Sequence, residues 1–152
     1  MHGKRAQRGF VLIAMSVTMI VLLAVIGLAF DFGRIYIARN EAQVFTDAAA
    51  MTAAARLDGT PAGIARARDA VAHLPMRWNL GTQPFTGVTV EFSADGSRWE
   101  REPKDPASIV KARVTAPSNN VDIIFLRAAG GPAALTVPAR SVAAIDPVRL
   151  TQ

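Results

Sequence analysis

The chain has 152 residues, of which 51% are hydrophobic and 19% charged, and its formal net charge is +5. It contains no cysteine, which excludes disulfide bonds, thiolate catalysis and cysteine-based metal sites. Lys4, Arg5 and Arg8 precede the first apolar segment, leaving fourteen cations against twelve anions, with interspersed signs, in the rest of the chain. That distribution is unlike a nucleic-acid-binding surface, so we expect no nucleic acid partner.

The first element is an apolar run of 21 residues without a charge, from Phe10 to Phe30. As a helix it would cover roughly 31 Å, close to the thickness of the hydrocarbon layer of a bilayer. A cleaved secretory signal would be shorter and would end at a cleavage site, whereas this run continues into helix-forming sequence. We therefore predict a transmembrane helix over 10–30, with the lipid bilayer as a partner, behind a cytoplasmic basic leader at 1–9. Cations beside a first span stay in the cytoplasm, so the remainder is expected outside the inner membrane.

The helix is expected to continue over 31–57 as an extramembrane stalk, because this stretch is rich in helix formers and lacks proline. The Asp-Gly pair at 58–59 provides a C-terminal glycine that ends it. The Thr-Pro pair at 60–61 then supplies an N-cap and a first-position proline for a second helix, which ends before Pro75.

Two faces of the stalk are distinctive. One is alanine-rich, and either reflects helix propensity alone or forms a packing face for the chain's own sheet or for a neighbouring subunit. The other is a polar row at four-residue spacing, which we interpret as a solvated face, with a role in fixing register against a partner helix as the alternative. The alanines are Ala48, Ala49, Ala50, Ala53, Ala54 and Ala55, and the polar row is Arg39, Gln43 and Asp47.

The rest of the chain changes to strand periodicity. Alternating apolar residues predict strands at 87–92, 109–115 and 135–145, the last weakened by Pro138 and therefore suited to a sheet edge. An Asp-Gly turn at 95–96 leads into a further strand at 98–102. A short amphipathic helix is expected over 121–129, ending at Gly130. The predicted fold class is α+β: a long N-terminal transmembrane and stalk helix, a second helix, and a small antiparallel sheet of about four strands. Residues 58–152 are expected to form one exported domain packed on the stalk.

The exported part offers no catalytic constellation. His73 follows Asp69 by four residues on the second predicted helix, and no serine is placed by motif to complete a triad. One histidine with scattered carboxylates gives no metal-ligand spacing. We interpret the pair as solvent-facing, and expect no enzyme activity, no cofactor, no metal and no small-molecule substrate.

The N-terminal third carries a pattern of a basic residue and glycine, an apolar span, then a run of polar, aromatic and alanine positions. These positions are Arg8, Gly9, Asp31, Gly33, Arg34, Tyr36, Arg39, Gln43, Asp47, Ala48, Ala49 and Ala50. In residue types and spacing the pattern resembles the Tad-like proteins, the TadE/TadG class of Flp pilus assembly components. The later strand, aromatic-containing helix, glycine and closing strand are similar in layout to the family.

The resemblance implies a pilin-like fold in the bacterial inner membrane, with one span, and partners among other pilus assembly proteins or pilin-like subunits. It also implies possible prepilin-type processing between Gly9 and Phe10. Pilins carry glutamate at the fifth position after that cut, where this chain has Ala14. A minor pilin-like or assembly-platform role is therefore expected, rather than that of a major pilin. The alternative is a membrane-tethered envelope binding module that does not enter a filament.

Overall fold

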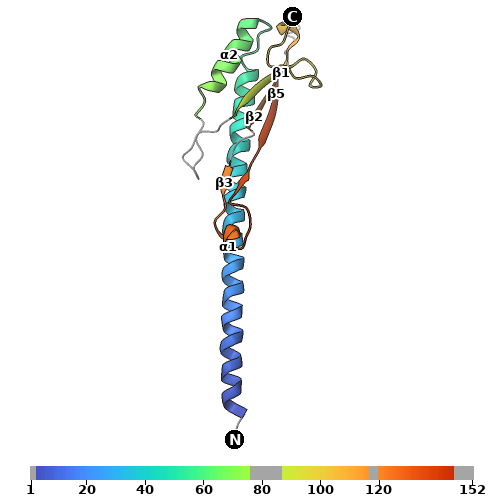
Figure 1. Ribbon diagram of the computed structural model, residues 1–152. Helices are drawn as coiled ribbons and strands as arrows, with labels where there is room; N and C mark the ends of the chain where they lie inside the picture. Colours follow the sequence, from blue (N-terminus) through green and yellow to red (C-terminus); the bar gives the residue numbers. More distant parts are fainter. Residues whose placement is uncertain (1–2, 76–86, 117–119, 146–152) are drawn as a thin grey trace, which may run out of the picture.

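The computed structural model describes residues 3–75, 87–116 and 120–145. Helix α1 (Gly3–Ala54) has 52 residues and is about 78 Å long at the standard rise. It forms the full length of the molecule, with the rest of the chain gathered along its C-terminal half (Figure 1). The predicted continuity of span and stalk is observed, and the helix ends three residues before the expected Leu57.

The N-terminal half of α1 meets the length and composition requirements of a membrane span. Its most apolar 18-residue window has a mean hydropathy of 2.8, and only 6% of that window is buried within the protein. Large apolar side chains are exposed around the helix from Phe10 to Ile26. Exposed apolar surface on this scale needs a non-aqueous environment, which supports membrane anchoring by a single span.

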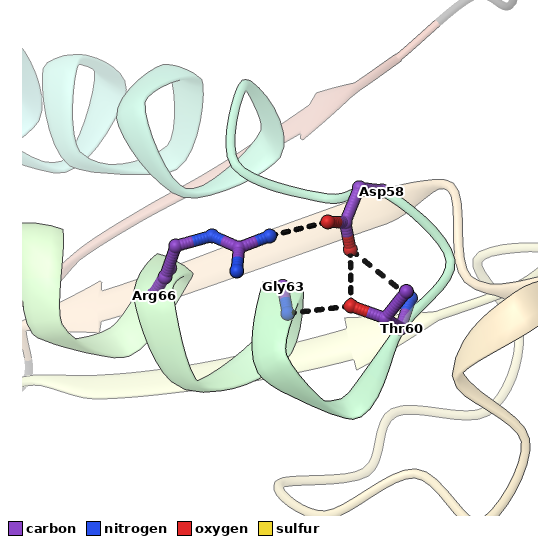
Figure 2. Close-up of polar contacts among 4 residues, drawn as sticks. All are labelled: Asp58, Thr60, Gly63 and Arg66. Carbon is purple, nitrogen blue, oxygen red and sulfur yellow. Dashed lines mark hydrogen bonds and ion pairs between the residues drawn. The ribbon is translucent and has the colours of Figure 1, made fainter.

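A tight turn joins α1 to α2 (Pro61–Ala72) and contains the predicted stop and start signals. Gly59 has a φ of 77°, which favours glycine. The Thr60 hydroxyl accepts a hydrogen bond from the Gly63 amide at 3.0 Å and donates to the Asp58 carboxylate at 2.7 Å (Figure 2). That bond, the Thr60 amide and the paired Arg66 guanidinium together lower the pKa of Asp58. The turn is therefore fixed by a few local contacts.

Thr60→Ala should lower the free energy of unfolding by about 1 kcal/mol, because the cap of α2 would be lost. Thr60→Ser keeps the hydroxyl and should retain most of the stability. Denaturant midpoints of the two variants in detergent test this prediction. Equal midpoints for the two would show that the hydroxyl contributes nothing.

The main sheet is antiparallel, with strand order β1-β2-β5. Its strands are β1 (Thr89–Ser93), β2 (Lys111–Ala116) and β5 (Ala139–Ala144), and a 3₁₀ helix η1 (Pro106–Ser108) precedes β2. Phe92 pairs with Ala112, which pairs with Ala143, and the first two are fully buried. In the next row Val90 pairs with Val114, which pairs with Ser141. This inward face rests on α1.

The α+β class is confirmed, but the predictions for residues 98–102, 121–129 and 135–145 are wrong in detail. The segment 121–129 is not one helix: strand β3 (Asn120–Asp122) precedes a single-turn helix α3 (Phe125–Ala128). Val121 and Ile123 are buried while Asp122 is exposed, which is the two-residue alternation of a strand. The segment 98–102 contributes only one bridge, between Phe92 and Glu100.

The closing strand is also divided. Residues before Pro138 form β4 (Ala134–Thr136), which pairs with β3 in a separate two-stranded sheet, and residues after it form β5. Proline cannot donate to a strand ladder, so it separates the two pairings. Strand β5 does lie at the edge of the main sheet, as Pro138 suggested.

The core lies between the sheet, α2 and one face of α1. The buried positions on that face are mostly alanines, whose small side chains let the strands approach the helix closely. They are Ala38, Ala42, Ala49, Ala50, Ala53 and Ala54. Ala48 and Ala55 are exposed. Most of the alanine-rich face is therefore occupied by the chain's own domain, and that part of the face is not available to a neighbouring subunit.

Candidate functional site: the two faces of the stalk helix

The Asp31 carboxylate holds the α3 segment against α1. Its side chain is only 2% exposed and accepts three backbone hydrogen bonds, from Ile124 at 3.0 Å, Phe125 at 2.9 Å and Leu126 at 2.7 Å. These are the amides at the start of α3, where Ile124 provides no side-chain cap. A carboxylate from a distant part of the chain thus performs the capping that is ordinarily local. We name this contact the Asp31 clasp.

A second polar contact joins α1 to β5, centred on the Ser141 hydroxyl. Gln43 donates to it at 2.9 Å, it donates to the Asp47 carboxylate, and Thr46 Oγ1 lies 2.9 Å away. Gln43 also donates to Asp47 at 3.0 Å. Thr46 and Ser141 are buried, so these hydrogen bonds satisfy polar groups within the interface. Two members of the polar row therefore fix register within the chain, and the row is not merely a solvated face.

The remaining motif residues are distributed around the helix. Gly33, Tyr36 and Arg39 are exposed. The Arg34 guanidinium lies 6.0 Å from the centre of the Phe30 ring. The structure therefore brings only some motif residues to the domain interface.

The proposed processing position, Gly9 and Phe10, lies within continuous helix and is exposed. Lys4, Arg5 and Arg8 fall in the first turns of α1, and their side chains lie outside the described part of the structure.

The outer face of the stalk carries an apolar stripe, which we define as Ile37, Val44 and Met51. Their exposed fractions are 46%, 61% and 61%. Seven-residue steps rotate by only about 20° on a helix, so the three side chains form one line. Val44 is two residues beyond the buried Ala42 and thus on roughly the opposite side of the helix. The described part of the chain leaves this stripe uncovered.

The Asp69 and His73 pair is on the surface, as expected. The His73 ring lies 3.3 Å from the Asp69 carboxylate, and both side chains are more than 70% exposed. Within residues 3–75, 87–116 and 120–145, no group of three or more potential ligands is placed to hold a metal ion.

These features describe a single-span α+β protein whose folded domain is fastened to the extramembrane half of its anchor helix. Residues 9–56 match the model of the Tad family, the TadE/G-like proteins of Flp pilus assembly. The resemblance seen in the sequence is confirmed over this segment, which is almost all of α1. No curated protein and no solved structure matches the chain.

The contacts made by Asp31 and by Ser141 each join a residue inside the matched segment to a residue outside it. Asp31, Gln43 and Asp47 lie within the matched segment, whereas their partners at 124–126 and Ser141 lie outside it. Sequence reasoning did not identify those partners. The one available signal for Ser141 was a small polar residue among inward positions of β5 that are otherwise alanine.

Proposed function

We propose that this protein is a membrane-anchored structural component of Tad/Flp-type pilus assembly, acting as a minor pilin-like subunit or as part of the assembly platform. The observation that carries this proposal is the apolar stripe of Ile37, Val44 and Met51, which remains exposed while the opposite face of α1 holds the chain's own domain. It lies in the segment that matches the pilus-assembly family.

The spacing of the stripe is suited to packing against another helix. A seven-residue apolar repeat is the spacing that two helices use when they wind around each other. Gly33, Ala48 and Ala55 are also exposed on this side of the helix and are small enough to let a second backbone approach. We therefore assign the stripe to the helix of another pilin-like subunit. The span would continue the same packing inside the bilayer.

The proposed orientation follows from the basic leader. Lys4, Arg5 and Arg8 would hold the N-terminus in the cytoplasm, so the domain would lie in the periplasm of a bacterial inner membrane. The exposed helix-packing surface on α1 supports a structural role, and the proposal includes no enzyme activity and no cofactor.

Replacing the stripe tests the proposal. The triple variant Ile37→Ser, Val44→Ser, Met51→Ser should reduce surface pili at least about tenfold, because burying three apolar side chains between helices contributes several kcal/mol. Pili are counted after complementing a deletion strain of the native host. Val142→Ser is a matched control: Val142 is 52% exposed on β5, away from the stripe.

The variant must also remain folded. The stripe is exposed in the free chain, so its unfolding midpoint in detergent should stay close to that of the parent protein. Normal piliation by the folded triple variant would refute the proposal. Loss of pili with Val142→Ser alone would indicate that the sheet, rather than the stripe, makes the required contact.

Two further measurements separate the specific roles. Replacing residues 10–30 with an unrelated transmembrane helix should abolish an assembly factor, whereas a tethered envelope binding module would keep working. The intact mass of protein from membranes containing the cognate prepilin peptidase then decides between subunit and platform. A chain beginning at Phe10 indicates a minor pilin-like subunit, and one retaining the basic leader indicates a permanent platform component.

A further inference from the structure

The α3 segment lies apart from the rest of the exported domain. We define the α3 loop as residues 123–133, which connect β3 to β4. Figure 1 shows β3 and the orange segment beside it near the middle of α1, whereas β1, β2 and α2 lie near the C-terminal end of that helix. The loop therefore lies close to the point where the predicted span ends.

The contacts of Phe125 identify the residues of α1 beside which the loop lies. A side chain at Gly27 would collide with Phe125, because a Cβ there would lie 2.7 Å from the ring. The Phe30 and Phe125 rings meet edge to face at 5.7 Å. Gly27 is three residues, or about 4.5 Å, inside the C-terminal end of the predicted span. Part of the folded domain thus lies beside residues that we assign to the bilayer.

Apart from Arg127, the exposed residues of this loop are apolar or glycine. Ile124 and Phe125 are each 47% exposed, although Phe125 packs on Gly27. Phe30 and Phe32 of α1, which lie next to Asp31 in the chain, are exposed as well. Through the contact between Phe30 and Phe125 this surface adjoins the exposed apolar surface of the span, so the medium that covers the span is in reach of the loop.

Many backbone amides of the loop are hydrogen-bonded, as a segment in contact with lipid requires. The Asp31 clasp occupies the amides of the N-cap residue Ile124 and of Phe125 and Leu126, the first two residues of α3. At its other end the Gly131 amide donates to Leu126 at 2.9 Å and the Ile123 amide donates to Ala133 at 2.9 Å. The same bonds occupy the Asp31 carboxylate, a group that would otherwise be costly at a membrane boundary.

We propose that the α3 loop is a second membrane contact, in which Ile124 and Phe125 enter the apolar edge of the bilayer beside the end of the span. An apolar face typically lies about 5–10 Å below the headgroups in such contacts, which agrees with the position of Gly27. Arg34, one turn further along α1 and next to the Phe30 ring, is at the level where lipid phosphates would be found. The occupant of this surface is the lipid, not a protein partner.

The chain is well suited to a direct test because it contains no cysteine. Ile124→Cys in the full chain can carry a nitroxide spin label, and its collision rates with oxygen and with a water-soluble nickel complex can be measured in phosphatidylcholine and phosphatidylglycerol nanodiscs. Val17→Cys in the span and Ala65→Cys on the exposed surface of α2 are the reference positions.

The label at 124 should resemble the label at 17: high accessibility to oxygen, and accessibility to nickel several-fold lower than at 65. Nickel accessibility equal to that at 65 would overturn the proposal, since it places the loop in water. Low accessibility to both reagents would also overturn it, because the surface would then be covered by protein. Slow amide exchange at residues 124–126 in the labelled protein verifies that the loop is still docked.

Discussion

Replacing Asp31 with asparagine is expected to release the α3 loop from the stalk helix. The two Asp31 oxygens accept three amides, and an asparagine side chain presents an oxygen on one side and an amino group on the other. At least one backbone donor would therefore lose its partner, and the remaining bonds would lose the assistance of the charge. The result should be a local opening of residues 123–133, with the main sheet still folded.

Hydrogen exchange followed by mass spectrometry measures this effect. The amides of residues 124–126 should exchange at least about tenfold faster in Asp31→Asn than in the parent protein. Asp122→Asn is the matched control, because it makes the same chemical change at an exposed aspartate beside the same loop. Unchanged exchange at 124–126 in Asp31→Asn would show that apolar packing alone holds the loop.

Replacing Ala49 with leucine is expected to destabilise the whole domain. Ala49 is fully buried where the domain packs on α1, so the larger side chain of leucine would have to displace its neighbours in the core. Overpacking a well-filled interface typically costs about 1–3 kcal/mol. The denaturant midpoint of the purified chain in detergent should fall accordingly.

Ala48→Leu is the natural comparison, since the neighbouring residue is exposed. Its unfolding free energy should stay within about 0.5 kcal/mol of the parent value. Because Ala48 lies beside the apolar stripe, the same variant should reduce piliation if a second helix packs there. The two alanines therefore separate folding from assembly, and equal destabilisation by both would contradict the assignment of the two faces.

Features with local causes could be predicted from the sequence. The extent of α1, the turn at 58–59 and the Thr60 cap each depend on residues within a few positions of one another. The inward positions of β2 followed from simple alternation. These signals are contained in short windows, and the structure agrees with them closely.

Features that depend on distant contacts could not be predicted in this way. Asp31 meets amides more than ninety residues away, and nothing near either segment indicates the pairing. The sequence alone favours a solvated face for the polar row around Gln43, because nothing near that row indicates that β5 packs against it. The helix expected over 121–129 was wrong because a three-residue strand leaves too little alternation to recognise, and its pairing with β4 is decided by tertiary structure.

The spacing of the two polar contacts along α1 has a mechanical consequence. Asp31 and Asp47 are sixteen residues apart, about 24 Å along the helix axis. The α3 loop and β5 both hold the same rigid rod from the side. A pull on the domain along that rod would load both contacts in shear at the same time. The two contacts would thus share the tension between the domain and the anchor helix.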